Sequence, residues 1–104
     1  MALTEEEYLL QCLSEECAEV SVEASKCIRF TKHNRYQLHT NLERLNIEYS
    51  QLMAIIFKLQ SIGVEIQVSQ EHFDNKLLAT ANFMDISRGL GTLEPEEVED
   101  VGDN

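Results

Sequence analysis

The sequence predicts an all-α protein, a helical bundle of two long helices plus a shorter third helix, completed by self-association. Glycine and proline are scarce, with four and one among 104 residues, so long stretches lack residues that interrupt helices. Apolar residues recur at steps of three and four over two long segments, which is typical of helices with one apolar face. Two capping-box patterns mark where these segments begin as helices.

The first helix is expected to begin just after Thr4, because Thr4 and Glu7 have the spacing of a capping box. Apolar or small residues then recur at helical spacing, at Leu9, Leu13, Cys17, Val20, Ala24, Cys27 and Ile28. The pattern stops near Phe30 or Thr31, where a polar connector follows. We therefore predict a helix from about residue 5 to residue 30 or 31.

The second helix is expected to begin after Thr40, which forms another capping-box pattern with Glu43. Its apolar row alternates steps of three and four through Leu42, Leu45, Tyr49, Leu52, Ile56 and Leu59. Gly63 is suited to end the helix, because glycine readily adopts the left-handed conformation found after helix ends. Residues 64–68 alternate like a strand but have no partner strand, so we predict a linker there.

The third helix is predicted to run from near Ser69 to about Ile86, with Phe73, Leu77, Ala81 and Met84 on one face. Three such helices make a thin bundle, and its uncovered apolar faces favour self-association. We predict a single domain over residues 1–91. Residues 92–104 carry six acidic residues and no basic one, which is typical of a disordered tail.

The net charge of −11, from 19 acidic and 8 basic residues, argues against two classes of partner. Nucleic acids and anionic membranes both bind to basic surfaces. No apolar run approaches the roughly 18 residues that span a bilayer, and the N-terminus lacks the pattern of a signal peptide. The sequence thus predicts a cytoplasmic protein with neither a nucleic-acid nor a membrane partner.

Acidic residues line one face of the first predicted helix. Glu16, Glu19 and Glu23 are three or four residues apart, so their charges repel unless something compensates. Magnesium prefers carboxylate oxygens as ligands and would supply that compensation. Glu48 lies beside the apolar row of the second helix, and helical bundles build metal sites between facing helices. The alternative is an ordinary solvated acidic face.

Two segments resemble a known family. The first is Glu15-Glu16-Cys17-Ala18-Glu19-Val20, followed by Ser25-Lys26-Cys27-Ile28-Arg29-Phe30, and the second is Asn41-Leu42-Glu43-Arg44-Leu45-Asn46-Ile47-Glu48-Tyr49-Ser50-Gln51-Leu52. In order, they resemble the first two helices of MazG-like nucleotide pyrophosphohydrolases, over roughly residues 9–60. The resemblance implies an all-α homodimer or homotetramer. It implies cleavage of nucleoside triphosphates to the monophosphate and pyrophosphate, with magnesium.

The resemblance also implies a metal site. Glu16 and Glu19 match the first motif of the family, and Glu48 matches the glutamate of the second, so these three are the expected catalytic carboxylates and ligands of Mg²⁺ or Mn²⁺. Gln51 stands where the family has Asp. An amide oxygen still coordinates metal, but it is neutral and cannot act as a base. Gln51 is therefore expected at the fourth metal position as a neutral ligand, or as a neighbour of the ligands.

Cationic side chains are needed for the remaining charge of a triphosphate. Lys26 and Arg29 lie within the resemblance and are the expected substrate contacts. Lys76 is added by the weaker similarity that extends to the third helix. The alternative for Lys26 and Arg29 is ordinary surface solubility, or pairing with Glu19 and Glu23.

Three functions follow from these observations. The first is a magnesium-dependent nucleoside triphosphate pyrophosphohydrolase that acts as a homo-oligomer. The second, favoured by Gln51, is a relative that binds a nucleotide or a nucleotide-like signal without hydrolysing it. The third is a helical interaction protein with an acidic face and no small ligand.

Overall fold

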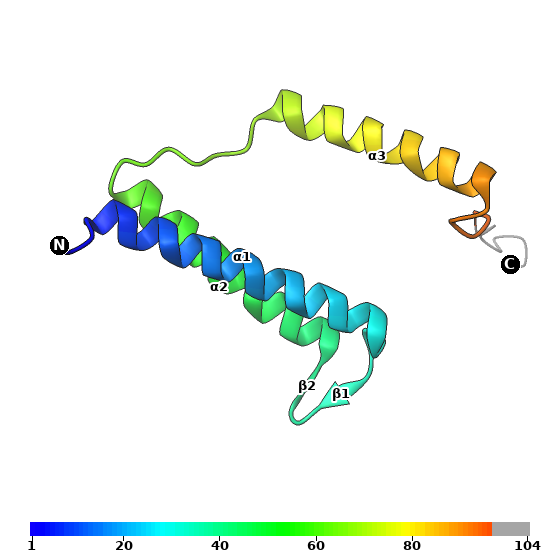
Figure 1. Ribbon diagram of the computed structural model, residues 1–104, viewed down its shortest axis with the longest axis horizontal. Helices are drawn as coiled ribbons and strands as arrows, with labels where there is room; N and C mark the ends of the chain where they lie inside the picture. Colours follow the sequence, from blue (N-terminus) through cyan, green and yellow to red (C-terminus); the bar gives the residue numbers. More distant parts are fainter. Residues whose placement is uncertain (97–104) are drawn as a thin grey trace, which may run out of the picture. The chain divides into compact units, whose positions relative to one another are not determined.

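The computed structural model describes residues 1–96 and confirms the all-α class. Three helices and one short β-hairpin follow in the order α1 (Glu5–Arg29), β1 (Arg35–Tyr36), β2 (His39–Thr40), α2 (Asn41–Ser61) and α3 (Gln70–Leu90) (Figure 1). Residues 64–68 form neither helix nor strand, as predicted for a linker. Residues 97–104, which hold most of the predicted acidic tail, lie outside the described residues.

The two predicted capping boxes begin α1 and α2. The Thr4 hydroxyl accepts the Glu7 N–H at 3.1 Å, and the Glu7 carboxylate accepts the Thr4 N–H at 2.9 Å. Thr40 and Glu43 repeat this exchange at 3.0 and 2.8 Å. Each box satisfies two N–H groups that have no partner within the helix. The hydrogen bonds from the threonine backbone, and then from its side chain, lower the pKa of each glutamate.

A β-hairpin joins the first two helices in the segment that the sequence indicated only as a polar connector. Its strands are antiparallel and have two residues each, with Arg35 opposite Thr40 and Tyr36 opposite His39. Gln37 in the turn has a φ of 60°, in the left-handed region that tight hairpin turns require. The strands lack the longer alternation that would have predicted them.

Three hydrogen bonds tie this connector to the start of α2. The Asn41 side-chain amide donates to the Thr31 carbonyl at 2.8 Å, and Asn41 is only 4% exposed. The backbone N–H groups of Asn41 and Leu42 donate to the carbonyls of Asn34 and Lys32 at 3.1 and 3.0 Å. The connection between the helices is therefore an ordered structural element, which holds the first turn of α2 against the end of α1.

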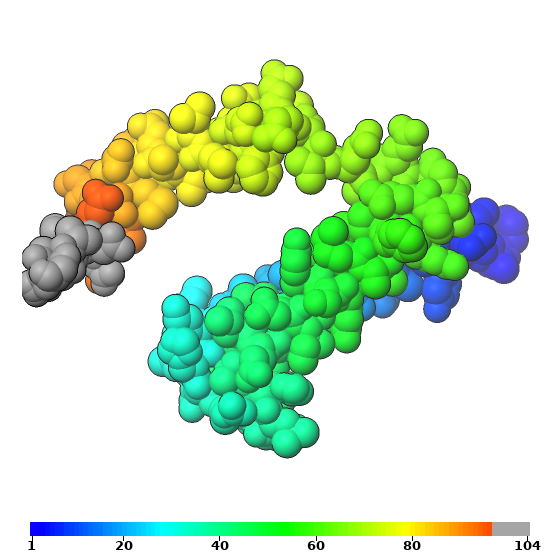
Figure 2. Space-filling model, turned by 180° about the vertical axis from the view of Figure 1, so that it is seen from behind, coloured from blue at the N-terminus to red at the C-terminus, as the bar shows by residue number. Residues whose placement is uncertain are grey.

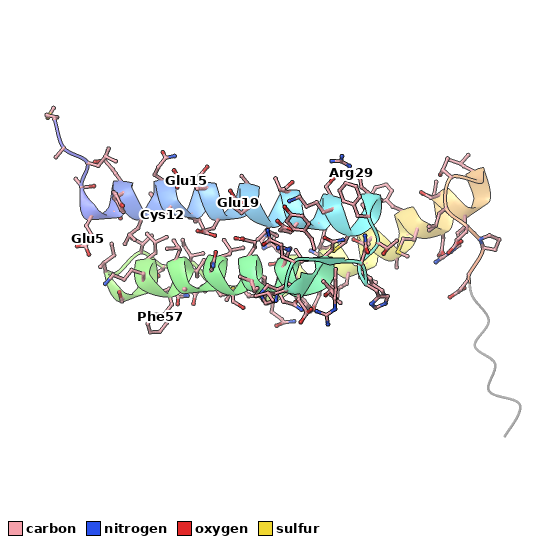
Figure 3. The ribbon with its side chains drawn as sticks, turned by 90° about the horizontal axis from the view of Figure 1, so that it is seen from below. Glu5, Cys12, Glu15, Glu19, Arg29 and Phe57 are labelled. Atoms are coloured by element: carbon pink, nitrogen blue, oxygen red, sulfur yellow. The ribbon has the colours of Figure 1, made fainter. Side chains whose placement is uncertain are left out.

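The helices α1 and α2 pack side by side and antiparallel (Figures 1 and 3). Their less exposed residues follow steps of three and four, through Leu9, Leu13, Glu16, Val20, Glu23 and Cys27 on α1, and Asn41, Leu45, Glu48, Leu52, Ile55 and Leu59 on α2. We call this contact the seam. Leu9 and Leu59 are its buried apolar residues, at 8% and 0% exposure.

The seam keeps at least half of each predicted apolar row and replaces the other members by residues at neighbouring positions. Cys17, Ala24 and Ile28 were expected inside on α1, but they are exposed. On α2, Tyr49 is 55% exposed and Leu42 lies at the margin. Successive residues are about 100° apart around a helix, so neighbouring rows share the same spacing. The anchoring of α2 to the end of α1 helps to select the row that contains Glu48.

The chain divides into two compact units, Met1–Ile66 and the part from Gln67 onward, and each is described by itself. The expectation of one domain over residues 1–91 stays a prediction. Among the helices of residues 1–96, none combines the length and the apolar character needed to cross a bilayer.

The third helix is longer than predicted. Ser69 caps its N-terminus as expected, but α3 extends to Leu90 and equals α2 at 21 residues. Gly89 lies within the helix, and Gly91, with a φ of 80°, ends it, because glycine adopts this left-handed conformation without strain. No residue of α3 is buried, so its predicted apolar face is exposed.

Candidate functional site

Carboxylates occupy the half of the seam toward the C-terminus of α1, where apolar side chains would ordinarily stabilise the contact between two helices. Glu23 is only 7% exposed, while Glu16 and Glu48 are half-buried and Glu19 lies exposed at the margin. We call Glu16, Glu19, Glu23 and Glu48 the carboxylate cluster. It draws on both helices, as the sequence predicted for Glu16, Glu19 and Glu48.

Two oxygens of the carboxylate cluster are buried without a hydrogen-bond partner among the described residues, Glu16 Oε2 and Glu23 Oε2. The other oxygen of Glu23 lies 3.5 Å from Lys26 Nζ. A buried polar atom without a hydrogen-bond partner lowers the free energy of unfolding, so such atoms are rare in folded proteins. These two oxygens are therefore expected to lower stability unless they gain a partner.

The glutamates of α1 act electrostatically on Glu48 of α2. The pKa of Glu48 is raised above its ordinary value of 4.5, first by burial and then by the negative charges of Glu16, Glu19 and Glu23. Both causes disfavour the charged form of Glu48. The raised pKa thus reflects first the burial of Glu48 on the inner face of α2, and then the charges of the three α1 glutamates.

Position 51, the fourth metal position that the resemblance implies, carries an amide instead of a carboxylate. Gln51 follows Glu48 by one turn on α2 and is exposed. Glu15 points outward from α1, away from α2 (Figure 3), so it does not replace the missing acid. Glu23 does lie in the seam. The sequence aligned Glu23 with Glu16 on one helix face, yet it was not predicted as a metal ligand because it is outside the family motif.

The donor set of the carboxylate cluster suits a hard divalent cation, because Mg²⁺ and Mn²⁺ prefer carboxylate oxygens. The two unpartnered oxygens of Glu16 and Glu23 are ligand atoms of this kind. Within residues 1–96, no group of three or more His, Cys, Asp or Glu side chains is arranged closely enough to hold a metal ion. Binding would therefore require these side chains to rotate toward a common centre.

The three predicted substrate contacts have different surroundings. Lys26 pairs with Glu23 and so adjoins the carboxylate cluster. Arg29 is exposed, points away from α2 (Figure 3), and its guanidinium lies 4.9 Å from the centre of the Phe30 ring. Lys76 is an exposed residue of α3, in the other compact unit. Among the predicted cations, only Lys26 is brought to the carboxylate cluster.

A cavity of about 310 Å³ lies beside Lys26, where α1, the β-hairpin and α2 meet. It is lined by Lys26, Phe30, Asn34, Arg35, Tyr36, Asn41 and Arg44. We call it the hairpin cavity. The segment 30–40, coloured cyan to teal, lies at one end of the helix pair (Figure 2). Sequence reasoning missed this cavity, although the density of basic residues between 26 and 44 is a signal that could have found it.

Comparison of the chain with protein families, with curated proteins and with solved structures finds no match.

Proposed function

We propose that the protein is a magnesium-dependent nucleoside triphosphate pyrophosphohydrolase, which converts a triphosphate and water to the monophosphate and pyrophosphate. The observation that supports this most directly is the carboxylate cluster, with two buried oxygens that have no partner among the described residues. The resemblance of residues 9–60 to MazG-like enzymes supplies the reaction. Manganese is the expected substitute for magnesium.

The proposed roles follow from the position of each residue. Glu16, Glu19 and Glu48 hold the metal, and Glu23 adds a carboxylate that Gln51 does not provide. When bound, magnesium neutralises phosphate charge and orients the attacking water. Water attacks the α-phosphorus, the bond to the β-phosphate oxygen breaks, and pyrophosphate leaves. A carboxylate of the cluster accepts the proton of the water.

A second function is favoured by one observation, the neutral and exposed amide of Gln51. Without a carboxylate at position 51, α2 contributes one negative charge fewer and one base fewer to the site. Under this second proposal the protein binds a nucleotide without hydrolysing it. The substitution Gln51→Asp separates the two proposals. If the wild type has near-zero hydrolysis and Gln51→Asp raises it, the wild type binds without hydrolysing. If the wild type hydrolyses and Gln51→Asp gives no gain, the amide belongs to a working site.

We further propose that the protein acts as a homo-oligomer. Large apolar side chains of α3 are exposed among the described residues, with Phe73 at 52%, Phe83 at 65% and Leu90 at 74%. Apolar surface of this kind is typical of association sites. Sedimentation velocity over a range of protein concentrations tests this proposal, and a monomer at every concentration would contradict it.

The test of the enzymatic proposal is pyrophosphate release from a panel of ribonucleoside and deoxyribonucleoside triphosphates, with Mg²⁺ or Mn²⁺. The variant is Glu19→Gln, because Glu19 is exposed and its substitution leaves the seam intact. The matched control is Glu15→Gln, which removes an equal charge from the outer face of α1. We expect Glu19→Gln to lower turnover at least 100-fold and Glu15→Gln to leave it unchanged. No turnover, or equal turnover in both variants, would contradict the proposal.

A further inference from the structure

The hairpin cavity is where the basic residues of this acidic protein gather. Five of the eight basic residues lie between 26 and 44, namely Lys26, Arg29, Lys32, Arg35 and Arg44. The only acid in this range is Glu43, whose carboxylate is engaged by the Thr40 N–H at 2.8 Å. The cavity itself is lined by three cations, two aromatic rings and two side-chain amides. It therefore presents a local positive charge in a protein of net charge −11.

The two arginines of the cavity are held in place by the hairpin. Arg35 Nη1 donates to the Leu38 carbonyl at 3.0 Å, and Arg44 Nη2 donates to the Tyr36 carbonyl at 2.9 Å. A guanidinium has five N–H donors, so each arginine keeps others for a ligand. Arg44 Nε is buried and has no hydrogen-bond partner among the described residues. Fixed guanidinium groups bind phosphate with a smaller loss of side-chain entropy.

The aromatic rings of the cavity add a surface for a flat ligand. Tyr36 is 63% exposed and Phe30 is 46% exposed. A guanidinium covers one face of each ring, that of Arg44 at 5.0 Å from the Tyr36 centroid and that of Arg29 at 4.9 Å from the Phe30 centroid. Each ring has a second face, and nucleic-acid bases of every kind stack on such faces.

We infer that the hairpin cavity binds a nucleoside monophosphate unit. Its cations Lys26, Arg35 and Arg44 hold the phosphate, and Tyr36 stacks on the base. A volume of about 310 Å³ lies within the range of small-molecule sites. The choice of a nucleotide, rather than another phosphorylated aromatic compound, rests on the proposed function.

Lys26 is the cation of the cavity that adjoins the carboxylate cluster. It lines the cavity, and its Nζ is 3.5 Å from Glu23 Oε1 of the carboxylate cluster. We therefore place the phosphate on the Lys26 side of the cavity, within reach of Arg35 and Arg44, and the base on the ring of Tyr36. Because the cations of the cavity neutralise the phosphate, the monophosphate binds without a divalent metal.

The test is isothermal titration calorimetry of the full chain in EDTA with AMP, GMP, CMP, UMP and inorganic phosphate. At least one nucleotide should bind tenfold more tightly than phosphate, because phosphate alone cannot use the aromatic ring. Arg35→Gln and Tyr36→Ala should each weaken that binding tenfold or more. The matched control is Lys58→Gln, which removes an exposed charge of α2 outside the cavity and should leave the affinity unchanged.

Circular dichroism melting checks that the variants fold, and Tyr36→Leu replaces Tyr36→Ala if the smaller side chain unfolds the hairpin. The inference is overturned if no nucleotide binds more tightly than phosphate, or if Arg35→Gln and the Tyr36 variant bind as the wild type does. The Glu19→Gln protein should keep nucleotide binding. Binding without pyrophosphate release would leave this inference standing and reject the proposed hydrolysis. Pyrophosphate release without monophosphate binding would reject this inference and leave the proposed hydrolysis standing.

Discussion

The seam between α1 and α2 has two halves that follow the same spacing and differ in chemistry. One half closes over Leu9 and Leu59, which are almost fully buried. The other half places Glu16, Glu23 and Glu48 between the same two helices. Burying leucine stabilises the fold, whereas burying a carboxylate without a full set of partners destabilises it. Departures from packing rules of this kind are expected at functional sites, where the residues serve another purpose.

The largest expected effect comes from the apolar half. Leu59→Ala leaves a cavity at a fully buried position and should lower the free energy of unfolding by about 2–5 kcal/mol. Urea unfolding followed by circular dichroism measures this loss. The matched control is Phe57→Ala, because Phe57 is 72% exposed and points away from α1 (Figure 3). An equal loss in both variants would mean that the seam is not the core of this unit.

In the carboxylate half, a substitution is expected to raise the free energy of unfolding. Glu23→Leu replaces a buried carboxylate by an apolar side chain of similar size and should raise the free energy of unfolding by about 1–2 kcal/mol. Lys26, whose side chain is 41% exposed, loses its partner but stays in contact with water. Glu15→Leu on the outer face is the control and should change stability by less than about 0.5 kcal/mol. If Glu23→Leu destabilises the fold, Glu23 is a structural residue, and the contrast between the two halves fails.

A smaller, pH-dependent effect is expected at Glu48. Its pKa is raised above 4.5 in the folded protein, so the folded state binds a proton more tightly than the unfolded state does. By linkage, its contribution to stability falls as the pH rises through 4.5 and then through the raised pKa. In EDTA, Glu48→Gln should therefore be more stable than the wild type at pH 7 by a few tenths of a kcal/mol.

This difference should shrink as the pH falls through the raised pKa and then through 4.5, because Glu48 becomes protonated first in the folded state and then in the unfolded state. Chemical unfolding of both proteins from pH 4 to pH 8 measures it. The capping carboxylates of Glu7 and Glu43, whose pKa values are lowered, change stability in the opposite direction but equally in both proteins. A difference that is constant with pH would show that the charge of Glu48 is not its cause.

Local chemistry made the fold class and the helix starts predictable from the sequence. The exchange between Thr4 and Glu7, repeated by Thr40 and Glu43, involves residues three positions apart and so depends on no other part of the chain. The end of α3 was less predictable. Two glycines stand close together there, and only the backbone shows that Gly91 ends the helix.

The composition of the site was predictable in part. Glu16, Glu19 and Glu48 could be named from their spacing and the resemblance, but the burial of Glu23 could not. Neighbouring rows on a helix have the same periodicity, so the sequence alone does not decide whether Tyr49 or Glu48 faces α1. Contacts between distant residues, such as that of Asn41 with Thr31, contribute to that choice. The hairpin cavity depends on the same contacts.

The proposed function rests on one claim, that the carboxylate cluster binds a divalent cation. The most direct test is the melting temperature of the wild type and of the Glu16→Gln/Glu48→Gln variant as MgCl₂ is added, with NaCl of equal ionic strength as the control. A ligand that binds only the folded state stabilises it in proportion to the logarithm of its concentration above Kd. The wild type should therefore melt at increasing temperature with MgCl₂ beyond the NaCl control, and the variant should follow that control. An equal response of both proteins to MgCl₂, or none beyond NaCl in the wild type, would contradict the claim.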